Sequence, residues 1–227
     1  LFCPRPSLPT ILQNAAMVFT ISDHNLRILT KMGIQATKIK CGIDIDFWSP
    51  TPLPTDNLKA LFVGRNVPKK GLPLLLEVWK NIPHPLKVIS DYNGPCPSNV
   101  TILGLQPPTR IKEEMAGANL FVLPCQKAPN GDMDGIPVVL MEAMATGRPV
   151  ITSNLSGIPE LIDETVGWIV EPNQPTQLRQ AILQANENQR KERGKNGRQR
   201  IIDFGHTIQH QSHAIWYNWK QIILKIK

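Results

Sequence analysis

The stretch MDGIPVVLMEAMATGRPVITS, residues 133–153, joins an acidic loop, an apolar segment and a second apolar run without a break. Pro137 suits the first position of a helix, because the N–H that it lacks would have no partner there. Gly147 suits the position just after a helix, where a left-handed backbone is common. Residues 149–152 have the length and composition of a buried strand. The stretch therefore predicts a helix over 137–146 followed by a strand.

The same alternation continues on both sides of this stretch. Short apolar runs bounded by Gly or Pro predict buried strands, and the segments between them have helical spacing. Strands that alternate with helices predict an α/β domain with a parallel sheet. The predicted strands are 17–21, 60–63, 86–90, 100–103, 120–123, 149–152 and 167–170. The predicted helices are 23–32, 73–80, 109–116, 137–146, 175–186 and 207–227.

The composition is that of an ordinary globular protein, with 41% hydrophobic and 19% charged residues among 227. A formal net charge of +7 favours anionic partners, and leaves nucleotide phosphates, nucleic acid and an acidic membrane open. The four cysteines form no C-x-x-C pair, which favours a reducing cytosol over a disulfide framework. No apolar run reaches the ~18 residues of a membrane span. We therefore expect a cytoplasmic protein.

Two acids flank the start of the helix at 137–146. The free N–H groups and positive dipole end of a helix make its N-terminus a ready site for an anion. Asp134 lies just before it, where the alternative role is that of an N-cap. Glu142 has apolar neighbours, among which an isolated carboxylate would be costly to bury. We expect Glu142 to bind sugar hydroxyls or, as the alternative, a structural partner such as a backbone amide.

The sequence LFVGRNVPKKG, residues 61–71, places Arg65 and Lys70 in the loop after a predicted strand. Ligands bind at the carboxyl ends of strands in open α/β sheets. An Arg that grips two oxygens and a Lys that acts as a point charge suit a diphosphate, and a solvated basic loop is the alternative. The loop matches neither the Walker A motif nor the G-x-G-x-x-G motif, which argues against an ATPase and against a dinucleotide-binding protein.

These motifs resemble the retaining glycosyltransferases of family 4, which have the GT-B fold. Asp134 and Glu142, with seven residues between them, are similar to the E-x7-E motif of that family, with Asp for the first Glu. The stretches EAMATGRPVITS, which begins at Glu142, and LSGIPELI continue the resemblance. GRNVPKKG is similar to its diphosphate loop, and TISDHNLRIL with KIKCGIDIDFW resembles its hinge. The resemblance, over about residues 22–178, implies the Rossmann-like, nucleotide-sugar-binding half of a GT-B enzyme.

The resemblance also implies a role for each site residue. Arg65 and Lys70 would hold the diphosphate of the donor, Glu142 the ribose hydroxyls, and Asp134 the transferred sugar. The shorter arm of Asp134 is expected to change which sugar is accepted or how it is aligned. Further donor contacts are implied at Gly104 and Leu105, near the base, and at Gly64, Gly135, Ile136, Pro137 and Val138, near the phosphates and the sugar.

No metal and no cofactor are expected, because fixed cations can stabilise the charge that develops on a departing diphosphate. Asp132 and Asp134 fit a D-x-D triplet literally, but the spacing of Asp134 to Glu142 explains that acid better. The expected activity is hexosyl transfer from a UDP- or GDP-sugar to a glycan or lipid-linked acceptor, with retention of configuration.

The resemblance divides the chain into three parts. Residues 1–50 would be the tail of the acceptor-side domain and a hinge, 51–205 the donor domain, and 206–227 a helix that packs back on the N-terminal domain. The proline-rich segment 43–57 is expected to be a linker. The lack of an initiator Met predicts a fragment without its acceptor domain, inactive by itself. The alternative is a non-catalytic nucleotide-sugar-binding subunit or a decayed fragment that needs a partner chain.

Two patterns favour other functions. His206, His210 and His213 could share one helical face and bind a metal, although a polar helix surface explains them as well. The basic run at 187–200 could contact nucleic acid or lipid headgroups. Because interleaved aromatic residues are absent, we expect a solvated helix end and loop, and no nucleic-acid partner. A peripheral contact with the inner face of the membrane stays open.

Overall fold

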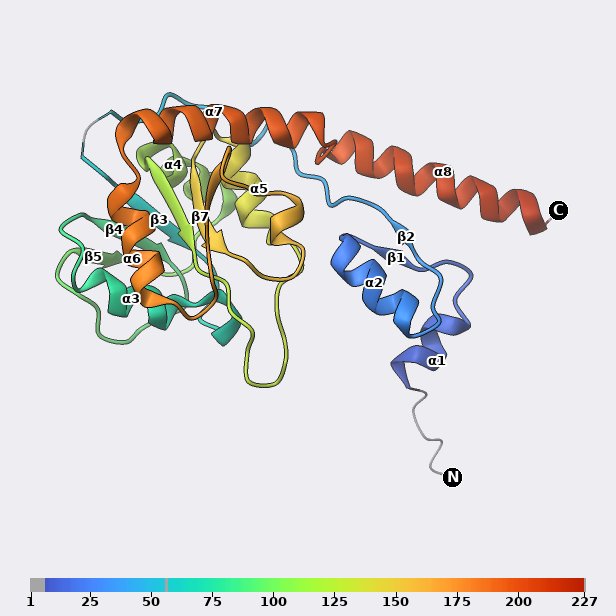
Figure 1. The fold of residues 1–227 in the computed structure, drawn as a ribbon. Coiled ribbons are helices and arrows are strands. Elements are labelled where there is room, and N and C mark those ends of the chain that lie inside the picture. The colour runs from blue at the N-terminus through green and yellow to red at the C-terminus, as the bar shows by residue number, and fades with distance from the viewer. Residues whose placement is uncertain (1–6, 56, 227) are drawn as a thin grey trace.

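A computed structural model describes residues 7–55 and 57–226. Three predicted features therefore lie partly outside the described residues: residues 1–6 of the acceptor-side tail, Asp56 of the linker and Lys227 of the last helix. The chain forms an α/β body and a small N-terminal unit, and a long C-terminal helix leaves the body on the side of that unit (Figure 1).

The body is built on a parallel sheet, as the sequence predicted, and this sheet has six strands in the order β5-β4-β3-β6-β7-β8. From β3 the chain first builds outward through β4 and β5, and then returns to build β6, β7 and β8 on the other side. The point between β3 and β6 is therefore the topological switch point, where open α/β sheets bind ligands. The strands are β3 (Ala60–Val63), β4 (Leu86–Ile89), β5 (Val100–Ile102), β6 (Leu120–Leu123), β7 (Val150–Ser153) and β8 (Gly167–Val170).

Helices cover both faces of this sheet (Figure 1). Because the strands are covered on both sides, every residue of β3, β6 and β7 is buried, which explains their continuous apolar sequences. Among the helices, α3 packs against α6, and α5 packs against α7. The helices are α3 (Leu72–Trp79), α4 (Pro108–Gly117), α5 (Val138–Ala145), α6 (Pro175–Gln184) and α7 (Glu187–Asp203), with short 3₁₀ turns at η1 (Pro68–Lys70) and η2 (Ile158–Glu160).

Helix α5 begins one residue later than predicted. Pro137 is its N-cap, with an extended backbone (φ −62°, ψ 125°), so the prediction that it opens the helix was wrong. The backbone of an N-cap residue is non-helical, and its own N–H is not needed for the hydrogen bonds of the helix, so proline fits there. The Pro137 carbonyl accepts a hydrogen bond from Leu140 N at 3.0 Å. The predicted end is confirmed: Gly147 has φ +80°, and the N–H groups of Gly147 and Arg148 close a Schellman motif on Met144 and Ala143.

The basic run at 187–200 belongs to one long helix, α7, so the prediction of a helix end and loop was wrong. Helix α7 packs on α5 through glycines, so its sequence lacks the apolar stripe from which a packed helix is usually predicted. A Cβ at Gly194 would overlap the carbonyl oxygen of Gly147, and one at Gly197 would lie 3.5 Å from Met144. Close approach of the two backbones therefore holds α7 on α5.

The N-terminal unit consists of α1 (Leu8–Gln13), β1 (Phe19–Thr20), α2 (Asp23–Lys31) and β2 (Thr37–Lys38). Strands β1 and β2 pair in parallel. Strand β1 is shorter than the predicted 17–21, and α1 and β2 were not predicted, because such short elements carry no periodic pattern. A two-stranded sheet of this size is marginal by itself and needs further packing.

The segment that joins the unit to the body runs side by side with the segment that joins the body to the last helix. Ile43 forms a parallel bridge to Thr207, with Ile43 N donating to His206 O at 3.2 Å and Ile208 N donating to Ile43 O at 3.1 Å. A Cβ at Gly42 would overlap the Thr207 carbonyl, so this crossing requires glycine. We call residues 40–43 and 204–208 the double hinge; helix α8 (Ile208–Ile226) follows it.

Candidate functional site

A cleft of about 510 Å³ opens at the switch point, between the loop after β3 and the loop that leads into α5. We call it the β3–β6 cleft. All predicted site residues except Gly104 and Leu105 line it, namely Gly64, Arg65, Lys70, Asp134, Gly135, Ile136, Pro137, Val138 and Glu142. Four residues that the sequence analysis did not name also line it, namely Ile21, Val63, Lys69 and Val139.

Gly104 and Leu105 follow β5, two strands from β3 in the sheet. All the strands of this sheet are parallel, so both residues lie at the carboxyl ends of the strands, as the cleft does. Neither residue lines the cleft. Gly104 has φ +69°, which turns the chain sharply after the strand, and Leu105 is 68% exposed. A role for either residue in holding a base stays a prediction.

The loop after β3 brings two lysines to Asp134. Lys70 Nζ lies 2.7 Å from Asp134 Oδ2, and Lys69 Nζ lies 3.5 Å from Asp134 Oδ1 and 3.0 Å from Asp132 Oδ2. Gly71, with φ +69°, lets this loop approach so closely that a Cβ would overlap the Pro124 carbonyl. Asp134 is therefore not the N-cap of α5, which is Pro137, three residues later. Its carboxylate forms an ion pair instead.

Lys69 could not be singled out from the sequence. Two adjacent lysines in a loop give no sign of which one points toward the ligand site. Here the 3₁₀ turn η1 directs both ammonium groups to Asp134, and Lys69 also pairs with Asp132. The pair of lysines is thus a single charged unit with two acids.

Glu142 is half-buried on the first turns of α5 and lines the cleft. Burial raises the pKa of Glu142 to about 7. Over residues 7–55 and 57–226, no hydrogen bond or ion pair reaches its carboxylate, so the structural backbone-amide partner that we considered is not present there. A half-buried carboxylate without a partner in the chain is suited to accept hydrogen bonds from a ligand.

Arg65 is exposed at the edge of the cleft. Its loop is tied to the loop after β4, because Asp91 Oδ1 accepts a hydrogen bond from Asn66 N at 2.6 Å, which lowers the pKa of Asp91. The arrangement gives the cleft three cationic side chains on one side and two carboxylates on the other. Such a set can bind a polyanion that also carries hydroxyl groups.

The structure contains no group of three or more His, Cys, Asp or Glu side chains that could hold a metal ion, as far as its described residues go. His206 lies outside helix α8, so His206, His210 and His213 do not share one helical face. The prediction that they could share one was wrong. His206 precedes α8 in the double hinge, where Nδ1 lies 2.9 Å from the Cys41 carbonyl and burial lowers its pKa. His210 Nδ1 lies 2.8 Å from Thr207 Oγ1.

Arginines of the basic run are bound within the chain, which weakens a nucleic-acid or lipid function for it. Arg193 donates to the Gly167 carbonyl at 2.8 Å and stacks over Trp168 with 3.9 Å to the ring centroid. Arg200 pairs with Asp163 at 2.7 Å. Arg190 and Arg198 likewise donate to backbone carbonyls, those of Ala185, Ile45, Trp48 and Ala145.

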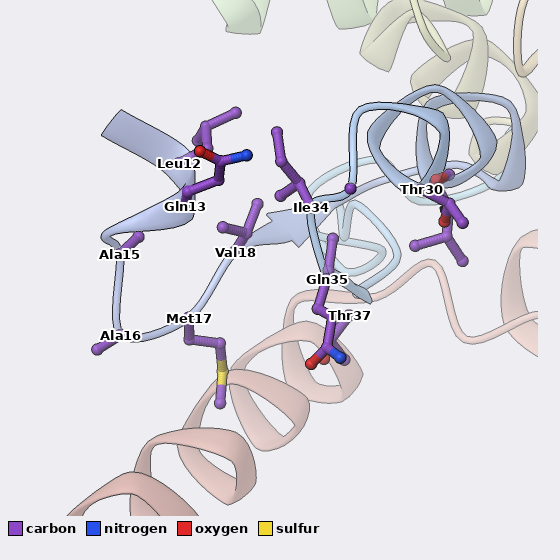
Figure 2. Close-up of a pocket in the computed structure, with 13 residues that line it drawn as sticks. Leu12, Gln13, Ala15, Ala16, Met17, Val18, Thr30, Ile34, Gln35 and Thr37 are labelled. Carbon is purple, nitrogen blue, oxygen red and sulfur yellow. Dashed lines mark hydrogen bonds between the residues drawn. The ribbon is translucent and has the colours of Figure 1, made fainter. Parts of the chain in front are cut away.

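A larger cavity, of about 1030 Å³, lies in the N-terminal unit between α1, β1, α2 and β2 (Figure 2). Its lining contains no charged side chain, and Met17 points from it toward α8. With no acid, base or cation to act on a substrate, this cavity offers less chemistry than the smaller β3–β6 cleft. The cleft is therefore the candidate functional site.

Residues 95–200 match the family described as Glycosyl transferases group 1. The chain is 32% identical over 200 residues to the "putative colanic acid biosynthesis glycosyltransferase WcaL" of Escherichia coli K12, covering 78% of this chain and 49% of the relative. It is 36% identical over 174 residues to the "amylovoran biosynthesis glycosyltransferase AmsK" of Erwinia amylovora, covering 68% and 40%. The chain thus spans about half the length of the curated relatives it matches.

Solved structures show the same fold. Sucrose-phosphate synthase from Thermosynechococcus elongatus matches with a TM-score of 0.83 at 24% identity, over 96% of this chain and 61% of that one. Anabaena Alr3699/HepE in complex with UDP and glucose matches with a TM-score of 0.77 at 18% identity, over 91% and 63%. Among the residues that the structure describes, no helix is long and apolar enough to cross a bilayer. The chain is thus similar to the group 1 glycosyltransferases over residues 95–200, and it has the fold of the C-terminal, Rossmann-like half of GT-B enzymes.

Proposed function

We propose that this chain is the nucleotide-sugar-binding half of a retaining glycosyltransferase of family 4. The observation that carries the proposal is the β3–β6 cleft, where Arg65, Lys69 and Lys70 face Asp134 and the unpartnered Glu142. Two relatives are named for the biosynthesis of colanic acid and amylovoran, and one solved relative in fold holds UDP and glucose. We propose a UDP- or GDP-sugar as donor, a hexosyl group as the transferred sugar, and a glycan or lipid-linked acceptor. The UDP and glucose in that structure support the UDP-hexose among these donors, and the polysaccharides named for the two relatives support a glycan acceptor.

The chemistry of transfer explains the charges. When the bond between the anomeric carbon and the diphosphate oxygen breaks, the electron pair stays on the diphosphate and the sugar becomes oxocarbenium-like. Fixed cations at the leaving oxygens lower that barrier, and Arg65, Lys69 and Lys70 would supply them. Glu142 would accept hydrogen bonds from the ribose hydroxyls, and Asp134 from the sugar. No step requires a metal or a cofactor in this proposal.

The three-part organisation predicted from the sequence belongs to the same proposal. Helix α8 exposes Trp216 and Trp219, and the small sheet of β1 and β2 needs further packing. An acceptor-side GT-B domain would cover both surfaces and bring the acceptor pocket. The 227-residue chain alone would then bind donor weakly and transfer no sugar. A cytoplasmic location stays part of this proposal.

A ligand-stabilisation screen tests the donor site. The unfolding temperature of the chain is measured with UDP-, GDP- and ADP-sugars at millimolar concentration, with a short oligonucleotide as a counter-ligand. A donor at tenfold its dissociation constant stabilises the fold by about 1.4 kcal/mol. We expect one nucleotide class to stabilise the chain and the oligonucleotide to have no effect. Stabilisation by the oligonucleotide alone would instead favour a basic nucleic-acid-binding module.

A further inference from the structure

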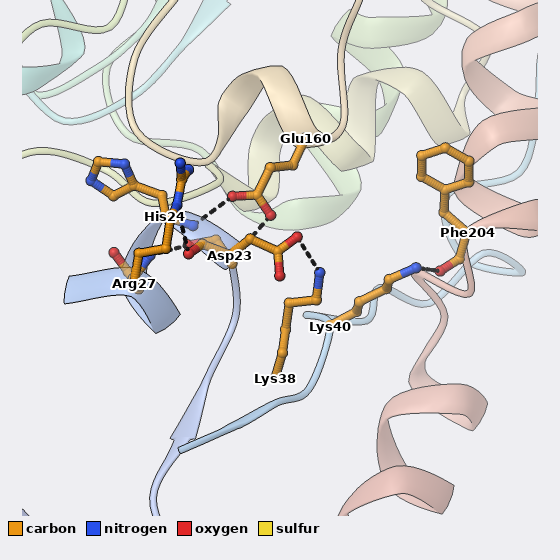
Figure 3. A network of polar contacts seen from close by, with 9 residues as sticks. Asp23, His24, Arg27, Lys38, Lys40, Glu160 and Phe204 are labelled. Atoms are coloured by element: carbon orange, nitrogen blue, oxygen red, sulfur yellow. Dashed lines mark hydrogen bonds and ion pairs between the residues drawn. The ribbon is translucent and has the colours of Figure 1, made fainter. Parts of the chain in front are cut away.

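Glu160 joins the body to the N-terminal unit through the backbone of α2 (Figure 3). Its Oε2 accepts a hydrogen bond from Asp23 N at 2.7 Å, and its Oε1 accepts one from His24 N at 2.8 Å. We propose that Glu160 is a positioning residue for donor binding, because this contact holds the turn at Ile21 as one wall of the β3–β6 cleft. The inference rests on the function proposed for that cleft.

Glu160 completes the cap of α2. The first four N–H groups of a helix have no partner within the helix. Past the N-cap Ser22 these are the N–H groups of Asp23, His24 and Asn25, since Leu26 N makes the first intrahelical bond, to the Ser22 carbonyl, at 3.0 Å. Ser22 Oγ accepts from Asn25 N at 3.1 Å. The N–H groups of Asp23 and His24 remain, and both bond to Glu160. A carboxylate at a helix N-terminus also interacts favourably with the helix dipole.

The surfaces that Glu160 holds together meet without side chains between them. A Cβ at Gly157 would lie 2.7 Å from Ser22 Cβ, and one at Gly135 would lie 3.2 Å from Ile21 Cδ1. The two glycine loops are themselves joined, with Gly157 N donating to Gly135 O at 3.2 Å. Because Ile21 and Gly135 both line the cleft, the position of α2 sets the shape of the cleft.

Two further polar contacts near α2 lie within the unit or at the double hinge. Asp23 pairs with Lys38 of β2 at 2.6 Å, within the unit itself. Lys40 Nζ donates to the Phe204 carbonyl at 2.8 Å, across the hinge (Figure 3). Without the Glu160 carboxylate the hinge contact would remain, but the two hydrogen bonds between Glu160 and the N-terminus of α2 would be lost. The unit could then turn about the hinge, and Ile21 would leave the wall.

The test compares Glu160→Ala and Glu160→Gln with wild type and with Glu164→Ala. Glu164 is exposed on the same segment and carries the same charge, so it is the matched control. Amide hydrogen exchange at Asp23 and His24 is followed by NMR, UDP and GDP are each titrated, and the unfolding temperature is recorded. We expect Glu160→Ala to speed both exchange rates by about tenfold or more and to weaken nucleotide binding by about fivefold or more.

Glu160→Gln should fall between wild type and Glu160→Ala, because its amide oxygen still accepts one hydrogen bond. It also keeps the test open if the alanine variant does not fold. Faster exchange with unchanged nucleotide affinity would overturn the positioning role and leave a structural cap. Unchanged exchange would overturn the contact itself. If wild type binds neither nucleotide while exchange responds to the variants, the proposed function of the cleft falls, and the donor role of Glu160 with it.

Discussion

Lys70 and Asp134 neutralise each other inside the β3–β6 cleft, with 2.7 Å between Nζ and Oδ2 and both side chains 15% exposed. A diphosphate that binds Lys70 must take it from this carboxylate. Lys69 lies 3.5 Å from the other oxygen of Asp134 and also pairs with Asp132, so it can keep Asp134 in place. We therefore expect donor binding to exchange one ion pair for another.

Asp134→Asn should tighten the binding of a nucleoside diphosphate that carries no sugar. The substitution frees Lys70 from its competing partner, and a gain of roughly 1 kcal/mol, or about fivefold in the dissociation constant, is expected. Glu77→Gln is the control, because Glu77 pairs with Lys80 outside the cleft. The measurement is a titration with UDP and GDP. Weaker binding by Asp134→Asn would show that the carboxylate orients Lys70 instead of competing for it.

Glu142→Gln should change how stability depends on pH. Burial raises the pKa of Glu142 from its ordinary value of 4.5 to about 7, so the folded state binds a proton more tightly than the unfolded state. This group therefore makes the fold progressively less stable as pH rises from about 4.5 to 7, and no further above that. The glutamine variant lacks this loss and should exceed wild type in unfolding temperature at pH 8, with the gain fading toward pH 4. A difference that is the same at every pH would contradict the shifted pKa.

The glycines of α7 and α4 should respond in opposite ways to alanine. A Cβ at Gly194 would overlap the Gly147 carbonyl, so Gly194→Ala should destabilise the chain by about 1–3 kcal/mol. Gly117, at the end of α4, has no atom within 4 Å of its added Cβ, and Gly117→Ala should stabilise by up to about 1 kcal/mol. Urea unfolding measures both. Equal effects would mean that α7 does not pack on α5 through Gly194.

Arg148 should be required for the fold and not for the site. Its guanidinium is fully buried and donates to carbonyl groups that include those of Thr51, Ala118 and Thr146. Arg148→Met leaves these acceptors without a donor and should cost about 3 kcal/mol or more in the free energy of unfolding. The exposed Arg179 is the control, and Arg179→Met should stay within about 0.5 kcal/mol of wild type. A mild effect of Arg148→Met would mean that the linker is not fastened to the body in this way.

The fold could be predicted where packing leaves a pattern in the sequence. Strands buried on both faces, such as Ala60–Val63, read as apolar runs. Helix α7 left no such pattern, because its contacts run through glycines and arginines that donate to distant carbonyls. The same holds for Glu160, whose partners lie more than a hundred residues away and are backbone groups of Asp23 and His24.

The site could be predicted as far as its residues share one local motif. Asp134 and Glu142 are placed by a single loop and helix, so their spacing alone brings both to the cleft. Lys69 and Ile21 could not be found in this way. The direction of Lys69 depends on the 3₁₀ turn η1, and Ile21 reaches the cleft only because the N-terminal unit folds back on the body.

The central claim is that the β3–β6 cleft binds a nucleoside diphosphate, and NMR mapping of backbone amides during titration with UDP and GDP tests it most directly. We predict that the largest shift changes fall on residues 64–71 and 134–142, and that they disappear when Arg65→Ala and Glu142→Ala are combined. Shift changes centred on α7 or on the cavity of the N-terminal unit, or binding that survives in the double variant, would contradict it.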